Sequence, residues 1–359
     1  MRILCLIDSL GSGGAQRQLV GLADLLKAKG NVVKVVYYHD VHFFKPFLEE
    51  RGVESEYLAG ITTKFSKFWK VFQLVKVYKP DVLIAYLDGA TMLGCLLRIA
   101  GLKFRLIVSE RSITEFLNWK RRIKFFLYRW SDAIVPNSYA ESELIGKFFP
   151  VLKNKIHTVT NFVDTDYFSP VQAGKATSPT IRILCVARIG SEKNVMLFMQ
   201  AVKLVVERGY SVRVDWFGTP SQKTPEYFKA CLTERGRLDM TDIFNFKPAS
   251  GQIRDEYRKA DVFCLPSLYE GFPNVICEAM SCGLPVLCSR VGDNPRLVEE
   301  GKNGYLFPPD EVEKIADSII RFCECSQEKK IEMGQYSRRI AVQRFSGEKF
   351  VSQYMEIFA

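Results

Sequence analysis

Two cations and two carboxylates in this sequence could together bind a ligand that carries both phosphate and hydroxyl groups. Arg188 follows an apolar run and Lys193 lies five residues later, whereas Glu270 and Glu278 enclose the segment Gly-Phe-Pro-Asn-Val-Ile-Cys. Fixed cations stabilise negative charge that develops on a leaving phosphate, and carboxylates accept hydrogen bonds from sugar hydroxyls. The competing interpretation is that these residues are solvated surface cations, helix caps and salt bridges. The choice depends on the elements that position them.

The residues between 265 and 283 predict a loop that leads into a helix. Gly271 allows a close approach of the backbone to a ligand, and Pro273 stands where a helix would begin. A helix that opens near Asn274 directs its first N–H groups toward an anion, with about half a positive charge from the helix dipole. Gly283 marks its end. Glu278 would then lie just over one turn inside this helix, within reach of the same ligand.

Strands and helices alternate along the whole chain. Compact apolar runs predict strands at Ile3–Ile7, Val32–Tyr37, Val82–Tyr86, Leu106–Ser109 and Ala133–Pro136, with a helix at Ala15–Lys29. A second series predicts strands at Ile181–Ala187, Val212–Phe217, Ile243–Phe246, Val262–Leu265, Val286–Cys288 and Tyr305–Phe307, with a helix at Asn194–Arg208. Such runs indicate parallel sheets covered on both faces. Ligands of these sheets bind beyond the carboxyl ends of the strands.

A polar stretch from Thr160 to Pro179 separates the two series. We therefore predict an α/β protein with two doubly wound, Rossmann-like domains that face each other across a cleft. The first domain spans residues 1–165, a linker spans 166–180, and the second domain spans 181–335. Residues 336–359 form a further segment, in which Tyr336–Phe358 is predicted to be helical.

The composition restricts the class of protein. The chain has 359 residues and a formal charge of +10, which is compatible with polyanionic ligands, anionic lipid or nucleic acid. The first residues predict a strand, not a signal peptide, so we expect the ten cysteines to be reduced. The only histidines are His39, His42 and His157, too few for the usual zinc sites beside the cysteines. No apolar run is long enough to span a membrane.

Taken in order, these residues resemble the signature of retaining glycosyltransferases of family 4, the glycosyl transferases group 1, which have the GT-B fold. The E-x7-E spacing of Glu270 and Glu278, Gly-Gly-Ala-Gln-Arg at Gly13–Arg17 and Asn161-x-Val-Asp164 all follow the family pattern. The resemblance implies that Glu270 lies by the donor sugar and Glu278 holds the ribose, while Arg188 and Lys193 stabilise the departing diphosphate. The other donor-binding residues it implies are Gly13, Gly14, Phe246, Lys247, Gly271, Phe272, Pro273, Asn274 and Val275.

The resemblance also implies the chemistry. We expect a retaining transferase that uses a nucleotide sugar, from family frequency a UDP-sugar, and needs neither a cofactor nor a metal. Asp164-Thr-Asp166 matches a metal-binding tripeptide, but it lies in the linker motif, so we interpret it as coincidental. In this family the C-terminal segment usually crosses back to the first domain.

One departure from the family pattern concerns the first domain. Many relatives carry a histidine after a strand of that domain, where this chain has Val108-Ser-Glu110-Arg111-Ser112. Glu110 could accept the proton of the acceptor or position a hydroxyl, and Arg111 could meet an acceptor phosphate. The alternative is that this pair only shapes the loop. Arg17 and Asn161 complete the predicted acceptor-binding residues.

Two segments combine lysine and arginine with aromatic residues. Ile61–Pro80 contains five lysines and no acid, with Phe65, Phe68, Trp69 and Phe72 at helical spacing. Leu102–Trp130 carries eight cations against two glutamates, together with Phe116, Trp119, Phe125, Phe126 and Trp130. Exposed, these residues would suit an anionic membrane surface. The acceptor would then be a polyprenyl-diphosphate-linked glycan, and the enzyme would be cytoplasmic and peripheral to the inner membrane. The alternative is that the aromatics are core.

Other functions stay open at this point. The charge permits a nucleic-acid-binding protein, although no recognition motif for nucleic acid is present. A dinucleotide-dependent oxidoreductase is disfavoured because Gly11-Ser-Gly13-Gly14 does not give G-x-G-x-x-G. A mannosyltransferase of the same fold that uses GDP-mannose is a further alternative. We expect partners to be a nucleotide sugar and a glycan or lipid-linked glycan, in the synthesis of a surface polysaccharide such as capsule or O-antigen.

Overall fold

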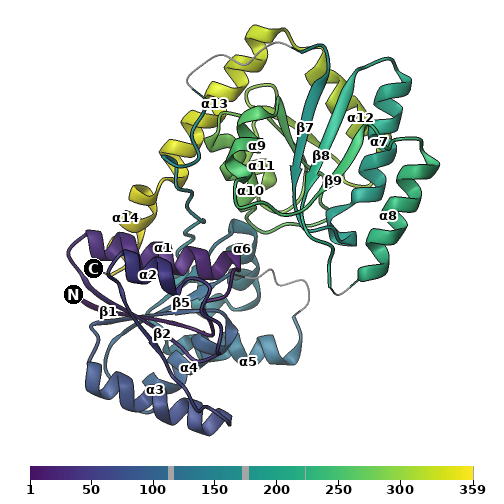
Figure 1. Ribbon diagram of the computed structural model, residues 1–359. Coiled ribbons are helices and arrows are strands. Elements are labelled where there is room, and N and C mark those ends of the chain that lie inside the picture. The colour runs from purple at the N-terminus through teal and green to yellow at the C-terminus, as the bar shows by residue number, and fades with distance from the viewer. Residues whose placement is uncertain (112–116, 172–177, 223, 359) are drawn as a thin grey trace. The chain divides into compact units, whose positions relative to one another are not determined.

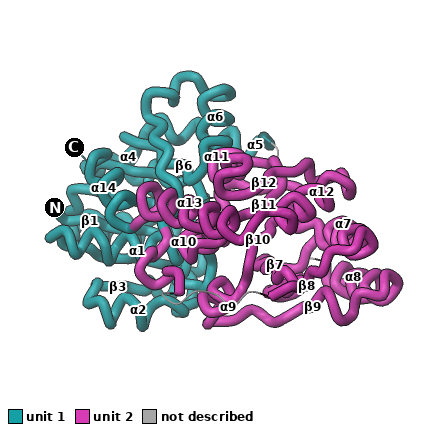
Figure 2. Tube along the Cα trace, turned by 90° about the horizontal axis from the view of Figure 1, so that it is seen from above, with its two compact units in different colours: residues 1–162, 347–359 teal, residues 163–346 magenta. Residues whose placement is uncertain are grey.

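The computed structural model describes residues 1–111, 117–171, 178–222 and 224–358 (Figure 1). The chain divides into two compact units (Figure 2). Unit 1 consists of Met1–Phe162 with Gly347–Ala359, and unit 2 consists of Val163–Ser346. Each unit contains one parallel sheet of six strands flanked by helices. This architecture confirms the predicted fold class of two doubly wound α/β domains.

The sheet of unit 1 has the strand order β3-β2-β1-β4-β5-β6. Its strands are β1 (Arg2–Ile7), β2 (Val32–Tyr37), β3 (Glu54–Tyr57), β4 (Val82–Tyr86), β5 (Arg105–Glu110) and β6 (Ala133–Pro136). All but β3 lie within one residue of the apolar runs that predict them. The apolar pattern misses β3 because its residues Glu-Ser-Glu-Tyr are mostly polar, which is common in an edge strand.

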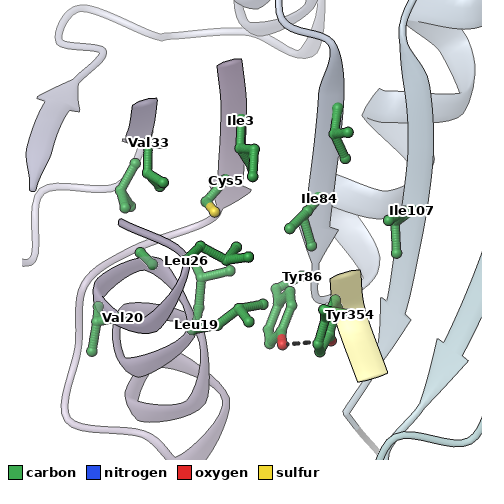
Figure 3. Close-up of a cluster of buried hydrophobic side chains, with 14 of the residues drawn as sticks. Ile3, Cys5, Leu19, Val20, Leu26, Val33, Ile84, Tyr86, Ile107 and Tyr354 are labelled. Atoms are coloured by element: carbon green, nitrogen blue, oxygen red, sulfur yellow. Dashed lines mark hydrogen bonds between the residues drawn. The ribbon is translucent and has the colours of Figure 1, made fainter. Parts of the chain in front are cut away.

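Helices cover both faces of this sheet because each has one apolar side. They are α1 (Gly14–Ala28), α2 (Lys45–Glu50), α3 (Lys64–Tyr78), α4 (Asp88–Ile99), α5 (Trp119–Leu127), α6 (Tyr139–Phe148) and α14 (Gly347–Phe358), with 3-10 turns η1 (Tyr128–Trp130) and η2 (Pro150–Lys155). α1, α2 and α14 pack on one core, and α3 to α6 pack on the other. Figure 3 shows Leu19 and Leu26 of α1 facing the strands, and the hydroxyl groups of Tyr86 and Tyr354 joined at 2.8 Å.

The sheet of unit 2 has the order β12-β11-β10-β7-β8-β9. Its strands are β7 (Ile181–Val186), β8 (Val212–Phe217), β9 (Phe244–Lys247), β10 (Val262–Leu265), β11 (Val286–Ser289) and β12 (Gly304–Phe307). Each lies within one residue of its prediction. The helices are η3 (Ser191–Lys193), α7 (Val195–Glu207), α8 (Pro225–Arg237), α9 (Ile253–Lys259), α10 (Asn274–Ser281), α11 (Asn294–Leu297), α12 (Val312–Cys323) and α13 (Gln327–Phe345). One core lies under α7, α8 and α12, and the other under α9, α10 and α13.

The C-terminal segment is two helices where the sequence suggests one. The chain turns at Ser346, which has extended backbone angles, so α13 ends in unit 2 and α14 begins in unit 1. The other passage between the units falls between Phe162 and Val163. The units therefore divide a few residues before the expected linker of residues 166–180, whose residues 172–177 lie outside the described part of the chain.

Candidate active site

Arg188 leaves the carboxyl end of β7 and forms an ion pair that the sequence does not reveal. Its guanidinium donates to the same oxygen of Glu192 through Nε at 3.2 Å and Nη2 at 2.5 Å. Burial by itself would raise the pKa of Glu192, but hydrogen bonds from Arg188 and from the backbone, together with the charges of Arg188 and Lys193, lower this pKa below its ordinary value. Arg188 keeps about half of its side chain exposed. The guanidinium is therefore oriented by Glu192 and still accessible to an anion.

Lys193 and Glu270 come together at the carboxyl edge of the sheet. The Nζ atom of Lys193 lies 2.5 Å from Oε1 of Glu270, and the hydroxyl of Ser267 donates to the same oxygen at 2.7 Å. Both charged side chains are less than one-fifth exposed. The two predicted positions are therefore in direct contact, and Ser267 adds a positioning contact.

Backbone and amide contacts hold the turn that carries Lys193. Asn194 adopts a left-handed conformation with φ of 59°, and its amide donates to the carbonyl groups of Pro266 at 3.2 Å and Pro309 at 2.6 Å. The N–H of Leu268 donates to the carbonyl of Glu192 at 2.9 Å. The turn after β7 and the loop after β10 therefore form one framework, so Lys193 and Glu270 keep their spacing.

Gly292 is packed against the backbone of the Glu270 loop. A Cβ atom at Gly292 would lie 2.0 Å from the carbonyl oxygen of Glu270, and the residue has φ of +51°. Both the space and the backbone conformation therefore require glycine. The N–H of Asp293 donates to the carbonyl of Gly271 at 3.2 Å. These contacts fix the loop from the side of β11.

The predicted helix after Pro273 is present as α10, with Pro273 as its N-cap. Its first turn contains Asn274 and Val275, whose N–H groups have no acceptor four residues earlier within the helix. Glu278 lies one turn further and is nearly buried, with its carboxylate accepting from the hydroxyl of Tyr257 at 3.0 Å. The helix thus presents an N-terminus suited to phosphate and an oriented carboxylate suited to hydroxyl groups.

Two predicted donor residues have side chains that face elsewhere. Phe272 is 7% exposed and packs edge-on against Phe345 of α13, so its ring belongs to the core. The ring of Phe246 packs against Phe228 of α8. The rings of these two residues therefore supply packing area, and their part in donor binding stays a prediction.

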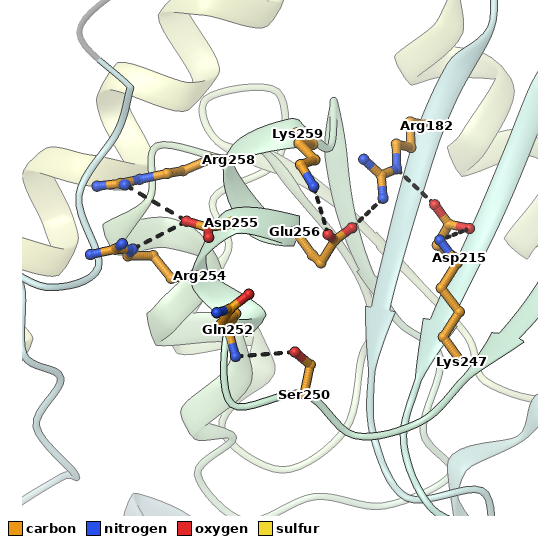
Figure 4. A network of polar contacts seen from close by, with 10 residues as sticks. All are labelled: Arg182, Asp215, Lys247, Ser250, Gln252, Arg254, Asp255, Glu256, Arg258 and Lys259. Atoms are coloured by element: carbon orange, nitrogen blue, oxygen red, sulfur yellow. Dashed lines mark hydrogen bonds and ion pairs between the residues drawn. The ribbon is translucent and has the colours of Figure 1, made fainter.

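Lys247 is also engaged within unit 2. Its Nζ atom lies 3.0 Å from the buried carboxylate of Asp215, to which Arg182 donates at 2.7 Å (Figure 4). Arg182 in turn donates to Glu256 at 2.5 Å. Burial tends to raise the pKa of Asp215, and hydrogen bonds from Lys247 and Arg182 lower it below its ordinary value. Lys247 is thus part of an ion-pair network that covers the face of β7, β8 and β9.

The remaining predicted donor residues lie in unit 1. Gly13 is the N-cap of α1 and Gly14 is its first residue, and both are exposed. A Cβ at Gly13 would meet the side chain of Gln16 at 2.3 Å. Arg17 is exposed in the first turn of the same helix. Their part in binding donor or acceptor stays a prediction.

Glu110 is enclosed. Its side chain is 1% exposed, Lys124 donates to one oxygen at 2.7 Å, and the hydroxyl of Tyr128 donates to the other. The prediction that Glu110 accepts the acceptor's proton does not fit this geometry, because both oxygens are used and face the interior. The structure favours the alternative, in which Glu110 shapes the loop, but its partner is Lys124 and not Arg111.

Arg111 makes several hydrogen bonds within unit 1. Its guanidinium donates to Ser109 at 2.7 Å, Asn161 at 2.8 Å, Tyr86 at 2.8 Å and Tyr354 at 2.6 Å. Arg111 and Asn161 are both predicted acceptor-binding residues, and here they bind each other. Through Tyr354, Tyr86 and Ser109, Arg111 connects α14 to the ends of β4 and β5. Most of its N–H donors are engaged in these contacts. This does not fit the predicted phosphate contact, which would need donors that are not already used.

Two models of known protein families match this chain. A family model described as "Glycosyl transferases group 1" matches residues 172–340, and one described as "Glycosyltransferase Family 4" matches residues 12–167. The two matches follow one another along most of the chain.

The chain belongs to the group 1 glycosyltransferases of family 4. It is therefore a transferase that uses a nucleotide sugar.

Relatives and solved structures agree with this classification. The chain is 25% identical over 332 residues to the GalNAc-alpha-(1->4)-GalNAc-alpha-(1->3)-diNAcBac-PP-undecaprenol alpha-1,4-N-acetyl-D-galactosaminyltransferase of Campylobacter jejuni, covering 89% of this chain and 88% of that protein. It is 27% identical over 240 residues to the D-inositol 3-phosphate glycosyltransferase of Saccharomonospora viridis, covering 64% of this chain and 55% of that protein. The crystal structure of Anabaena Alr3699/HepE in complex with UDP superimposes with a TM-score of 0.86 at 22% identity, covering 99% of both chains, which shows the shared GT-B fold.

Within the glycosyltransferase, the Asp-x-Asp tripeptide forms a turn. The carboxylate of Asp164 accepts from the N–H groups of Asp166 at 3.2 Å and Tyr167 at 2.9 Å. Among the residues that the structure describes, no group of three or more His, Cys, Asp or Glu side chains is arranged to hold a metal ion. No helix in the described ranges is long and apolar enough to cross a membrane.

Four residues of this site escape prediction from the sequence: Glu192, Ser267, Tyr257 and Gly292. Glu192 directly precedes Lys193, and its place between the two predicted cations is a signal that could have been used. Tyr257 and Gly292 belong to other elements, and only tertiary packing brings them to Glu278 and Glu270.

Proposed function

We propose that this glycosyltransferase moves a hexose or an N-acetylhexosamine from a UDP-sugar to a glycan acceptor, with retention of the anomeric configuration and without a metal ion. The observation that carries the proposal is the contact of Lys193 with Glu270 at 2.5 Å, on two loops of which one also carries Arg188 and the other leads into α10. An anion held at this point would meet two cations and a helix N-terminus.

Each group has a separate task in this proposal. Arg188 and Lys193 bind the diphosphate and stabilise the charge that grows on it as the glycosidic bond breaks. Glu270, held by Ser267, binds hydroxyl groups of the donor sugar, and Glu278 binds the ribose. Because the two cations supply positive charge at the leaving group, we propose that no divalent metal is needed there. The acceptor hydroxyl then attacks from the side on which the diphosphate leaves, which retains the configuration.

We propose a polyprenyl-diphosphate-linked glycan as acceptor, in the synthesis of a surface polysaccharide such as capsule or O-antigen. The printed name of the Campylobacter relative, which includes a PP-undecaprenol-linked glycan, supports this choice.

Exposed aromatic residues support a peripheral place at the cytoplasmic face of a membrane. On α5 and η1, the exposed residues Trp119, Ile123, Phe126 and Trp130 recur every three or four positions. On α3, Phe65 and Trp69 are exposed as well. Lysines and arginines alternate with these side chains, which suits an anionic bilayer interface.

Some of the aromatic residues in these two segments are core residues, as the alternative interpretation expects, but others are exposed. Phe125 is fully buried, and Phe68 and Phe72 are partly buried against the same core. Phe116 lies outside the described residues.

Hydrolysis of a panel of nucleotide sugars tests the proposal. UDP-, GDP- and ADP-linked hexoses and N-acetylhexosamines are incubated with the protein, with and without EDTA, and the released nucleotide is measured. We expect UDP-sugars to be cleaved at equal rates under both conditions. Faster cleavage of GDP-mannose would favour the mannosyltransferase alternative, and loss of activity in EDTA would contradict metal independence. Thermal stabilisation by DNA, with none by any nucleotide, would reject the function as a whole.

A further inference from the structure

The carboxyl edge of the unit 1 sheet carries an exposed carboxylate that the sequence does not single out. Asp88 follows β4 as the first residue of α4, and its side chain is 59% exposed. Its Oδ1 atom accepts from Lys124 at 2.9 Å, and Lys124 also binds the buried Glu110. Among the described residues, Oδ2 of Asp88 makes no hydrogen bond or ion pair. Lys124 thus holds one oxygen of Asp88 and leaves the other available to a ligand.

The backbone that presents Asp88 is strained. Leu87 has φ of 72° and ψ of 157°, a region that is essentially restricted to glycine. Such conformations persist only where the surrounding structure imposes them, and they concentrate at functional sites. The strain lies at the residue that turns the chain from β4 into α4, where ligands of parallel sheets bind.

A buried hydroxyl group without a partner lies beside this turn. Tyr38 follows β2 and is 4% exposed, and its hydroxyl has no hydrogen-bond partner in the described part of the chain. A Cβ atom at Gly89, the residue after Asp88, would lie 2.7 Å from this hydroxyl. Gly89 itself is exposed. An orphaned donor is costly unless a ligand or water satisfies it, and here it lies against the backbone of Gly89, the residue after Asp88.

The ammonium group of Lys67 lies close to Tyr38. The Nζ atom of Lys67, in the first turn of α3, lies 4.1 Å from the ring centre of Tyr38. Desolvation lowers the pKa of Lys67, and the nearby carboxylate of Asp8 partly offsets it. Figure 1 shows α3 and α4 on the same side of the sheet, and their contacts confirm that they are neighbours. Lys67 is therefore placed to bind an anionic group on a ligand that reaches Asp88.

We propose that Asp88, Tyr38 and Lys67 form the acceptor site of this transferase. Asp88 and Tyr38 bind a hydroxyl of the acceptor sugar, and Lys67 binds the diphosphate that links this sugar to its lipid. The inference rests on the proposed function and supplies the acceptor residues that Glu110 and Arg111 do not provide.

The test separates the two half-reactions of the full-length protein. Donor hydrolysis without acceptor reports on the donor site, whereas transfer reports on both sites. Two acceptors are compared, N-acetylglucosamine linked to farnesyl diphosphate and the same sugar as an octyl glycoside. The variants are Asp88→Asn, Tyr38→Phe and Lys67→Met. Glu50→Gln, an exposed carboxylate on α2, and Lys76→Met, exposed on α3, are matched controls.

We expect Asp88→Asn and Tyr38→Phe to raise the KM for both acceptors by about 10-fold or more, the size of one lost hydrogen bond to a charged or buried group. Lys67→Met should raise the KM only for the diphosphate acceptor. Donor hydrolysis should stay within about two-fold of wild type in all variants, and the controls should change neither reaction.

Three outcomes would overturn the inference. One is an unchanged acceptor KM in both Asp88→Asn and Tyr38→Phe. Another is a parallel fall of hydrolysis and transfer, which would indicate a structural role. The last is a wild type that hydrolyses its donor but transfers to neither acceptor, which would reject the assignment of acceptor chemistry. If the wild type cleaves no nucleotide sugar at all, the proposed function itself fails, and this result is distinct from the other three.

Discussion

The Nζ atom of Lys193 and a carboxylate oxygen of Glu270 lie 2.5 Å apart although 77 positions separate the two residues in the chain. Each charge is mostly buried and is compensated by the other. Removing one partner therefore leaves the other charge mostly buried and without its ion-pair partner, which is costly. When a diphosphate binds to Lys193, the ammonium group interacts with two anions, the diphosphate and the carboxylate of Glu270.

Lys193→Ala should lower the rate of glycosyl transfer by roughly 100- to 1,000-fold, the loss expected for one key donor to a developing anion. The measurement is kcat for donor hydrolysis and transfer. Lys203→Ala removes a partly exposed lysine from α7 in the same unit and is the matched control, expected to stay near wild type. Turnover of Lys193→Ala close to wild type would reject its role at the leaving group.

Glu278→Gln should raise the Kd for UDP by about 10- to 100-fold, because a hydrogen bond to a charged group is worth roughly 1.5–3 kcal/mol. The carboxylate of Glu278 is oriented by Tyr257 at 3.0 Å. Calorimetric titration with UDP and with its 2′-deoxy and 3′-deoxy analogues measures the effect.

Combining the Glu278→Gln substitution with the deoxy analogues tests directly whether Glu278 contacts the ribose. If Glu278 binds the ribose, loss of the contacted hydroxyl should weaken binding to wild type and leave binding to Glu278→Gln nearly unchanged. Equal losses in both proteins for both analogues would show that Glu278 does not contact the ribose.

Gly292→Ala should destabilise unit 2 by roughly 1–3 kcal/mol or more and reduce donor hydrolysis. The added Cβ would collide with the carbonyl of Glu270, and φ of +51° is unfavourable for alanine. Gly236→Ala is the paired control, since Gly236 lies within α8 with nothing near its Cβ position. This control should be stabilised by about 0.5–1 kcal/mol. Denaturant unfolding measures both, and an unaffected Gly292→Ala would contradict the close packing.

Asp215→Asn should lower the free energy of unfolding by about 1–3 kcal/mol at pH 7, because it weakens a buried carboxylate that binds Arg182 and Lys247. The pKa of Asp215 is depressed in the folded protein. Its stabilisation is therefore present above the unfolded pKa of about 3.9 and is lost as the pH falls through the lower folded value. The difference between wild type and variant should be constant from about pH 5 to 8 and shrink below about pH 4.

An exposed ion pair provides the control for this pH dependence. Asp317 pairs with Arg208 at 3.0 Å, and both side chains are well exposed. Asp317→Asn should cost less than about 1 kcal/mol at any pH. A difference for Asp215→Asn that does not diminish on acidification would show that the carboxylate's charge is not what stabilises the network.

Replacing Trp119 and Phe126 together by serine should reduce binding to vesicles that contain anionic lipid. Each aromatic side chain is about half exposed or more, and an interfacial aromatic residue contributes through the apolar area it buries. Flotation with anionic and neutral vesicles at low salt measures binding. Ile331→Ser, which removes an exposed apolar residue from α13 in unit 2, is the control. Failure of the wild type to float with anionic vesicles at low salt would reject the membrane proposal.

The sequence by itself determined most of the strands and the places in the chain of the candidate donor-site residues. Apolar runs and helical periodicity depend on local residue order, so they located Arg188 and Lys193 after β7 and Glu270 before α10. Because parallel strands end at one edge of a sheet, these residues had to lie close together. The start of α10 at Asn274 was also predictable, since proline and glycine act through local backbone geometry.

Only the tertiary structure decided which charged and aromatic residues are available to a ligand. Glu110 ends β5 and Asp88 follows β4, yet the first carboxylate is enclosed and the second is exposed, and Lys124 contacts both. Arg111 is held by Tyr354, a residue 243 positions away. Partner choice and burial depend on contacts between distant segments. No local pattern encodes these contacts, because the free energy that selects them arises only when helices and strands pack.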